Sequence, residues 1–484
     1  MTTRRALRIA IIGAGPGGLC MAIKLKEAGF DDVVLFEKTE RVGGTWNHNR
    51  YPGCACDIQS ELYSFSFDIN TGWSRPFAPQ PEILAYLDGV AERHGVLPHC
   101  RFGLEVTSAS WSDAKTEWTL GFGDGSSHVA DIVVSGLGMF NDLVHPDLEG
   151  LESFAGTCFH TAKFDWSHNL TGRRIAVIGS AASAIQMVPE IVKTAGHVDY
   201  YQRTANWVLP KEDDPYSEEV LRQRAADPGL VVARRNEIYE SIDGGTAFLD
   251  EARRGELEAL GQQAIDLVRD PETRKKLVPN HPWGCKRPLF SNVYYPSFNR
   301  PNLALVTDPI ERVTKSGVVA GGVLRPVDTL ILATGYAANR FLSVIDVRGR
   351  GGLSIHDAWK DGPQAYLGAT TAGFPNLFQL YGPNTNGGSI ITMIEFQVDH
   401  VMALVHRIAN EKLAGLDVRP DAMDVYNEEI QKAIGNVSVW QSDCHHYYAS
   451  ASGRIVTQYP HSMTVFKQAL AAVSVDAFEA IPLG

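Results

Sequence analysis

Short apolar runs bounded by glycine recur along the chain, and they predict the strands of parallel sheets. The first run, 9–12 (IAII), is β-branched and too short to form a helix. An amphipathic segment follows and predicts a helix at 22–27, with Gly29 as its stop. The next apolar run, 33–36 (VVLF), predicts a second strand. Strand, helix and strand in this order predict a βαβ unit.

The same pattern returns in the middle of the chain. The run 174–178 (RIAVI) predicts a strand, and 198–202 predicts the strand that comes after the next helix. Further apolar runs at 303–306 and 329–332 predict later strands. The predicted fold class is therefore α/β, with two Rossmann-like domains of the three-layer type.

Residues 212–285 break this alternation. The stretch is rich in Glu, Arg, Lys and Gln, and its apolar positions predict helices around 221–224, 236–241 and 256–269. We expect a helical insertion that could serve as a lid. The predicted domains are 1–150 together with 337–484, then 151–211 together with 286–336, and 212–285 as an insertion in the second domain.

The first βαβ unit carries a G-x-G-x-x-G spacing at Gly13, Gly15 and Gly18. In such a fingerprint the first glycine makes the tight turn, the second lets a pyrophosphate approach, and the third lets the helix pack on the strand. Glu37 follows at the tip of the second strand, 24 residues after Gly13. A carboxylate there accepts hydrogen bonds from a ribose diol. The unit predicts a site for an adenine dinucleotide without a 2′-phosphate.

The second unit is a variant of the same fingerprint. Gly179 keeps the first glycine, whereas Ala181 and Ala184 stand where the other two are expected. Alanine at the third position is tolerated, but alanine at the second weakens the motif. Arg203 lies 24 residues after Gly179, at the place that Glu37 occupies in the first unit. An arginine there suits a 2′-phosphate, which predicts NADPH. The alternative is that Arg203 is an ordinary solvated charge.

Composition narrows the range of partners and compartments. The 484 residues carry a net charge of −12, which argues against nucleic acid or an anionic membrane as partner. Seven scattered cysteines form no disulfide framework and favour a cytoplasmic location. The chain contains no apolar stretch of the ~18 residues that a membrane span needs. Cys54 and Cys56 lack a second ligand pair, and packing explains the run 444–446 (CHH) better than a metal does, so no metal site is predicted.

Taken together, the motifs resemble class B flavoprotein monooxygenases, most of all the Baeyer–Villiger monooxygenases. The motifs that carry the resemblance are GAGPGG (13–18), GGTW (43–46), YPGCACD (51–57), FAGTCFHTAKFDW (154–166), YQRTANW (201–207), GCKRP (284–288), ATGY (333–336), GPNT (382–385) and the C-terminal set Trp440, Cys444, Tyr448, Gly453, Arg454 and Pro460.

The family pattern F-x-G-x-x-x-H-x-x-x-W, followed by Pro or Asp, is met with one departure. Phe154, Gly156, His160 and Asp165 fit, but Phe164 stands where Trp is expected. The related flavin monooxygenases that oxygenate nitrogen or sulfur carry Phe or Tyr at this place. Asp165, in contrast, favours the Baeyer–Villiger side.

The resemblance implies an FAD-binding first domain, an NADPH-binding second domain, and insertion of one oxygen atom of dioxygen next to a ketone carbonyl through a C4a-peroxyflavin. It implies an active-site arginine at Arg287, a carboxylate that orients it at Asp57, and a role for His160 in coupling cofactor movement to catalysis. A structural ion pair is the alternative for Arg287, and a loop cap is the alternative for Asp57. The implied cofactor-binding residues are Gly13, Gly15, Gly18, Glu37, Gly44, Thr45, Trp46, Asp57, Gly179, Ser180, Ala182, Ser183, Arg203, Thr204, Lys286, Ala333, Thr334 and Gly335.

Three other functions stay open at this point. Phe164 supports oxygenation of amines or sulfides. A disulfide reductase would need a redox cysteine pair, and the spacing of Cys54 and Cys56 is wrong for one. A non-catalytic dinucleotide sensor would carry the same two fingerprints. The expected partners are a small ketone and dioxygen, and the chain could be a monomer or a homodimer.

Overall fold

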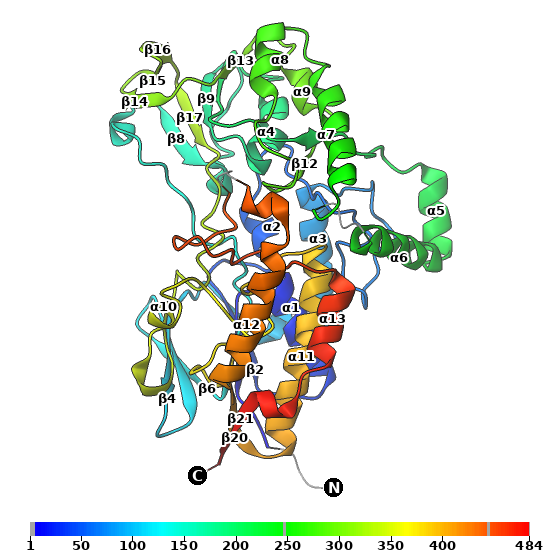
Figure 1. Cartoon of the computed structure of the whole chain (residues 1–484), viewed down its shortest axis with the longest axis vertical. Helices are drawn as coiled ribbons and strands as arrows, with labels where there is room; N and C mark the ends of the chain where they lie inside the picture. The colour runs from blue at the N-terminus through cyan, green and yellow to red at the C-terminus, as the bar shows by residue number, and fades with distance from the viewer. Residues whose placement is uncertain (1–4, 245–247, 443–445, 484) are drawn as a thin grey trace.

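A computed structural model describes residues 5–244, 248–442 and 446–483, and it contains two five-stranded sheets (Figure 1). All strand pairs of the first sheet are parallel. Its spatial order is β19 (Leu377–Gln379), β7 (Ile132–Ser135), β1 (Ile9–Ile12), β2 (Val33–Glu37) and β3 (Cys100–Phe102).

The second sheet is parallel as well, and four of its five strands repeat this order when the first sheet is read from β3. Its spatial order is β13 (Leu303–Val306), β10 (His197–Tyr201), β9 (Arg174–Ile178), β17 (Thr329–Leu332) and β8 (Thr157–His160). In both sheets the fingerprint strand, β1 or β9, lies at the centre. The α/β class with two dinucleotide-binding folds is confirmed.

We call the first sheet with the segments that cover it the first half, and the second sheet with its covering segments the second half. The two halves share one further feature, a three-stranded antiparallel meander between corresponding strands. In the first half it lies between β3 and β7, and in the second between β13 and β17. The strands are β4 (Val106–Ser112), β5 (Glu117–Phe122) and β6 (Ser127–Ala130) in one meander, which β18 (Asp346–Arg348) joins, and β14 (Ile310–Thr314), β15 (Gly317–Ala320) and β16 (Val323–Pro326) in the other. The repeat detected in the fingerprints therefore extends over most of each half.

Helices cover both sheets. In the first half α1 (Pro16–Glu27) packs on α11 (Ile390–Asn410), which also contacts α13 (Met463–Ala471). In the second half α4 (Ala182–Ile191) packs on α9 (Tyr294–Ser297). The remaining longer helices are α3 (Gln80–Arg93), α5 (Glu218–Ala226), α6 (Gly229–Asp243), α7 (Glu251–Ile265), α8 (Pro271–Leu277) and α12 (Pro420–Gly435).

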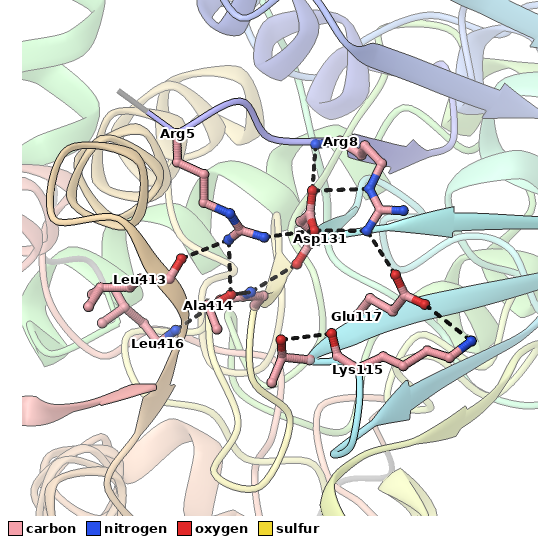
Figure 2. A network of polar contacts seen from close by, with 10 residues as sticks. Arg5, Arg8, Lys115, Glu117, Asp131, Leu413, Ala414 and Leu416 are labelled. Atoms are coloured by element: carbon pink, nitrogen blue, oxygen red, sulfur yellow. Dashed lines mark hydrogen bonds and ion pairs between the residues drawn. The ribbon is translucent and has the colours of Figure 1, made fainter. Parts of the chain in front are cut away.

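A polar network ties the chain before β1 to the C-terminal segment. Asp131 accepts hydrogen bonds from the guanidinium groups of Arg5 and Arg8, both at 2.9 Å (Figure 2). Arg5 also donates to the carbonyl of Leu413 at 2.7 Å, on β20 (Leu413–Val418). β20 pairs with β21 (Phe478–Pro482). Segments from both ends of the chain therefore lie together beside the first sheet.

Two buried ion pairs dock α5 and α6 on the first half. Arg224 of α5 contacts Glu61 at 2.8 Å, and Arg235 of α6 contacts Glu395 of α11 at 3.3 Å. Arg235 also donates to the carbonyls of Glu61 and Ser64, at 3.0 and 2.7 Å. All four charged side chains are at most 11% exposed. Because removing one partner of a buried pair leaves an uncompensated charge, each pair resists separation strongly.

Candidate functional site

One large cavity brings most of the predicted site residues together. Its volume is about 2110 Å³, and its lining includes Thr45, Trp46, Asp57, Gly179, Ser180, Ala182, Ser183, Arg203, Thr204, Lys286, Arg287, Ala333, Thr334 and Gly335. A smaller neighbouring cavity is lined by Gly13, Gly15, Glu37 and Gly44, and it shares Thr45 and Trp46 with the large one. Gly18 and His160 line neither.

The first fingerprint has the backbone of a dinucleotide turn. Gly13 has a φ of +95°, and a Cβ there would lie 2.9 Å from the carbonyl oxygen of Gly136. A Cβ on Gly18 would lie 1.9 Å from the carbonyl oxygen of Gly13, so only glycine lets α1 pack this closely. The buried carboxylate of Glu37 accepts hydrogen bonds from the backbone N–H groups of Ala14 and Thr39, both at 2.9 Å. The predicted acidic tip of β2 therefore lies beside the glycine turn.

The second fingerprint makes the same turn with a different composition. Gly179 has a φ of +114°, and a Cβ there would lie 2.2 Å from the carbonyl oxygen of Ala333. The backbone of residues 333–335 therefore lies against Gly179 in the same way as the backbone of Gly136 lies against Gly13. Ala181 has a φ of −95° and an extended backbone, which any residue can adopt. The alanine that weakened the motif in the sequence is thus compatible with the turn.

Both fingerprint helices begin without a capping side chain. The N-cap residues are Gly15 for α1 and Ala181 for α4, and neither helix has an acidic residue in its first turn. The free N–H groups and the positive end of the helix dipole suit a pyrophosphate. At the first helix, Gly44 approaches so closely that a Cβ on it would lie 2.7 Å from the Cα of Gly15. Backbone atoms thus form both turns, and the residues present fit two dinucleotides.

A pair of cations lies at the predicted 2′-phosphate position. Burial lowers the pKa of Lys286, and the nearby guanidinium of Arg203 lowers it further. Neither cation forms an ion pair with a carboxylate among the described residues. Thr204 is held by the hydroxyl of Ser180, which donates to its carbonyl oxygen at 3.1 Å. Two like charges held together without a carboxylate favour a bound anion over the alternative of a merely solvated Arg203.

Arg287 and Asp57 form the central charge pair of the large cavity. A guanidinium nitrogen of Arg287 donates to a carboxylate oxygen of Asp57 at 2.6 Å, and the two side chains are 37% and 21% exposed. The Asp57 carboxylate raises the pKa of Arg287, so the guanidinium stays charged. Tyr447, which the sequence analysis missed, lies beside this pair. Burial raises the pKa of its phenol, while Arg287 acts in the opposite direction.

His160 lies close to the segment that leaves the second sheet after β17. It ends β8, pairs with Leu332 of β17, and its ring centroid lies 6.3 Å from that of Tyr336. Its Nδ1 accepts a hydrogen bond from the backbone N–H of Ala162 at 3.1 Å. Burial, reinforced by His145, lowers its pKa to about 4. A neutral histidine in this position supports the crossing segments and does not reach the cavity.

The residues that followed His160 in the family pattern have structural partners. Phe164 packs between Phe159 and Trp166, with ring centroids at 5.1 and 5.0 Å. The carboxylate of Asp165 accepts hydrogen bonds from the backbone and hydroxyl of Ser167, at 2.9 and 2.6 Å. Asp165 thus closes a turn, and Phe164 belongs to a short aromatic cluster.

Cys54 and Cys56, which lie beside the site, give no support to a redox cysteine pair. Cys54 and Cys56 are buried free thiols. Burial raises the pKa of Cys54 to about 12, and burial also raises the pKa of Cys56, so both stay protonated. Cys444 lies outside the described residues. Across the part of the chain that the structure describes, no group of His, Cys, Asp and Glu is arranged to hold a metal, and no helix has the length and apolarity to cross a bilayer.

Comparison with known proteins gives a consistent group of relatives. A family model described as pyridine nucleotide-disulphide oxidoreductase matches residues 10–243. A Baeyer-Villiger monooxygenase from Pseudomonas aeruginosa is 40% identical, over 94% of this chain and 88% of that protein. FAD-binding monooxygenase ktnD from Aspergillus niger is 35% identical, over 96% of this chain and 80% of that protein. The crystal structure of cyclohexanone monooxygenase from Rhodococcus sp. Phi1 bound to NADP+ matches with a TM-score of 0.90 and 31% identity, over 99% of each chain.

Proposed function

Because the chain belongs to the Baeyer–Villiger monooxygenases, we propose that Arg287 and Asp57 are the pair with which it promotes oxygen insertion. The enzyme is an FAD- and NADPH-dependent monooxygenase that inserts one oxygen atom of dioxygen next to a ketone carbonyl and gives an ester or lactone. The observation that supports the residue assignment is the 2.6 Å contact between the two side chains inside the cavity that the second fingerprint borders, which shares Thr45 and Trp46 with the cavity at the first fingerprint.

The charges of this pair suit the chemistry. FAD, when bound, supplies the capacity to take reducing equivalents from NADPH and to activate dioxygen. Arg287 places a permanent positive charge where the substrate carbonyl oxygen develops negative charge. Asp57 holds the guanidinium in one orientation, so that little reorganisation is needed when that charge appears. Tyr447 keeps its proton because its pKa is raised, and so remains a hydrogen-bond donor beside Arg287.

The two dinucleotides have separate places in this proposal. FAD is held by the glycine turn of the first half, with Glu37 at the ribose and Thr45 and Trp46 between the two cavities. NADPH is held by the turn at Gly179, with Arg203, Thr204 and Lys286 around the 2′-phosphate. Ser180, Ala182, Ser183 and the stretch 333–335 complete that wall.

The domain boundaries, the location and the assembly belong to the same proposal. We assign 1–150 and 337–484 to the FAD domain, 151–211 and 286–336 to the NADPH domain, and 212–285 to the insertion. The contacts of Arg5 with β20 support joining the two ends of the chain. A cytoplasmic location suits an enzyme that consumes NADPH. Size-exclusion chromatography with light scattering decides between a monomer and a homodimer.

The decisive experiment compares Arg287→Ala with Arg340→Ala. Arg340 is 70% exposed and lies 3.9 Å from Asp142, so it provides an arginine control away from the catalytic pair. With NADPH and a panel of linear, cyclic and aromatic ketones, we expect Arg287→Ala to lower ester formation by roughly 10²–10³-fold, the range for losing a charge-stabilising donor. NADPH oxidation should continue, with hydrogen peroxide as product. Ester formation at the wild-type rate by Arg287→Ala overturns the assignment, and a wild type that oxygenates only sulfides or amines overturns the reaction.

A further inference from the structure

Asn49 and Arg50, called the turn below, directly follow the short helix that borders both cavities. This helix, α2 (Thr45–His48), carries Thr45 and Trp46. The backbone N–H and the side-chain amide of Asn49 both donate to the carbonyl of Thr45, at 3.0 and 3.1 Å. The position of Asn49 therefore fixes the position of α2.

Two side chains from the second half bind this turn. The hydroxyl of Tyr336 donates to the side-chain oxygen of Asn49 at 3.0 Å. The indole N–H of Trp166 donates to the backbone carbonyl of Arg50 at 2.9 Å. The sequence separations are 287 and 116 residues, so neither contact is a local feature of the chain.

The two donors come from two different crossing segments. Trp166 follows β8 and Tyr336 follows β17, and these two strands are parallel neighbours in the second sheet. His160 is the last residue of β8, and its ring centroid lies 6.3 Å from that of Tyr336. Phe164 packs on Trp166 at 5.0 Å. A shift of the β8–β17 edge of the second sheet thus reaches the turn through both donors at once.

We propose that Trp166 and Tyr336 form a clamp, a pair of positioning residues that couple the second half of the enzyme to α2. Here the term clamp means these two side chains and their hydrogen bonds to Asn49 and Arg50. The inference rests on the proposed function in one respect, because it takes α2 to border the bound FAD. It also gives the departure at Phe164 a meaning, because the indole that the family pattern places at 164 is found two positions later and is used to hold the turn.

The clamp has a defined chemical consequence. While it is closed, α2 keeps its place between the two cavities. When it opens, reducing equivalents are lost to dioxygen without oxygenation of a ketone. The balanced leak is NADPH + H⁺ + O₂ → NADP⁺ + H₂O₂, in which NADPH is oxidised, dioxygen takes two electrons, and the two protons come from NADPH and the solvent.

The test uses Trp166→Phe and Tyr336→Phe, each of which keeps an aromatic ring and removes the donor. Each has a matched control: Trp111→Phe removes the indole bond to Asp113 at 3.0 Å, and Tyr239→Phe removes the bond to the Thr464 hydroxyl at 2.8 Å. Amide hydrogen exchange of the full-length protein, over a peptide covering 45–57, provides a readout that does not depend on turnover. We expect exchange there to accelerate roughly two- to tenfold in each clamp variant, the range for one net hydrogen bond, and to stay unchanged in the controls.

A second readout follows the leak in the FAD-loaded enzyme. We expect hydrogen peroxide per NADPH to rise in Trp166→Phe and in Tyr336→Phe. Because both hydrogen bonds hold one turn, the fold increase in hydrogen peroxide per NADPH in the double variant should be smaller than the product of the two single increases. Unchanged exchange at 45–57 in both clamp variants overturns the clamp even if the wild type makes ester. A wild type without ester formation refutes the proposed function instead, and the exchange experiment is still valid in that case.

Discussion

Replacing His160 by Gln removes a buried titratable group from the joint between the two halves. His160 is 4% exposed, and the pKa of about 4 of its imidazole lies below the ordinary value of 6.5 because burial disfavours the charged form. Protonation must therefore destabilise the folded state. The contribution of His160 to stability is fully present above pH 6.5 and is lost as the pH falls toward 4.

The size of the effect follows from the two pKa values. One pKa unit corresponds to ~1.36 kcal/mol, so the complete window from pH 6.5 to pH 4 is worth about 3 kcal/mol. Between pH 7 and pH 5 the loss is about 2 kcal/mol by the same linkage relation. Glutamine keeps an acceptor for the N–H of Ala162 but does not titrate. The wild type should therefore lose about 2 kcal/mol relative to His160→Gln over this interval.

Urea unfolding at pH 7 and at pH 5 measures this difference in the free energy of unfolding. A histidine titration by NMR, with ¹³C-labelled imidazoles, gives the pKa directly, because the signal that disappears in His160→Gln belongs to His160. That signal should keep the chemical shift of a neutral ring down to about pH 5. If it titrates above pH 6, or if the stability gap between the two proteins is the same at both pH values, the reasoning is wrong.

Two further predictions concern the dinucleotides. Arg203→Ala and Lys286→Ala should each raise the KM for NADPH about tenfold or more, because each removes one charged contact to the 2′-phosphate. The KM for NADH should change little. Steady-state kinetics with both coenzymes checks this prediction, and equal effects on both coenzymes would contradict it. Gly44→Ala places a Cβ 2.7 Å from the Cα of Gly15, at a backbone φ of +52°, so FAD should be lost more readily on dialysis, and full retention of flavin absorbance would contradict the expected clash.

Local patterns predicted the central strands well. The predictions 9–12, 174–178, 303–306 and 329–332 coincide with β1, β9, β13 and β17. These strands are buried in parallel sheets and consist of nearly continuous apolar runs, which is the pattern that such a position requires. The helix predicted from residue 22 begins at Pro16, because the glycines of the fingerprint hid its first turn.

Elements and contacts that depend on distant parts of the chain were harder to predict. The meander of β14, β15 and β16 was missed because its strands are short and β16 is largely exposed. The contact between Arg287 and Asp57 spans 230 residues, and only the family resemblance pointed to it. Tyr447 carries no local signal for a place beside Arg287. Such sites are assembled by tertiary packing, which hydrophobic periodicity does not report.

The docking of α5 and α6 has a mechanical consequence. In the sequence these helices belong to the stretch between β11 (Val208–Leu209) and β12 (Leu289–Phe290), but the pairs Arg224–Glu61 and Arg235–Glu395 fasten them to the other half. α6 also supplies Ile238 and Ile242 to the wall of the large cavity. The two ion pairs therefore keep this part of the cavity wall stationary with respect to the first half. A displacement of the second sheet changes the width of the large cavity, while the part of its wall that α6 lines keeps its shape.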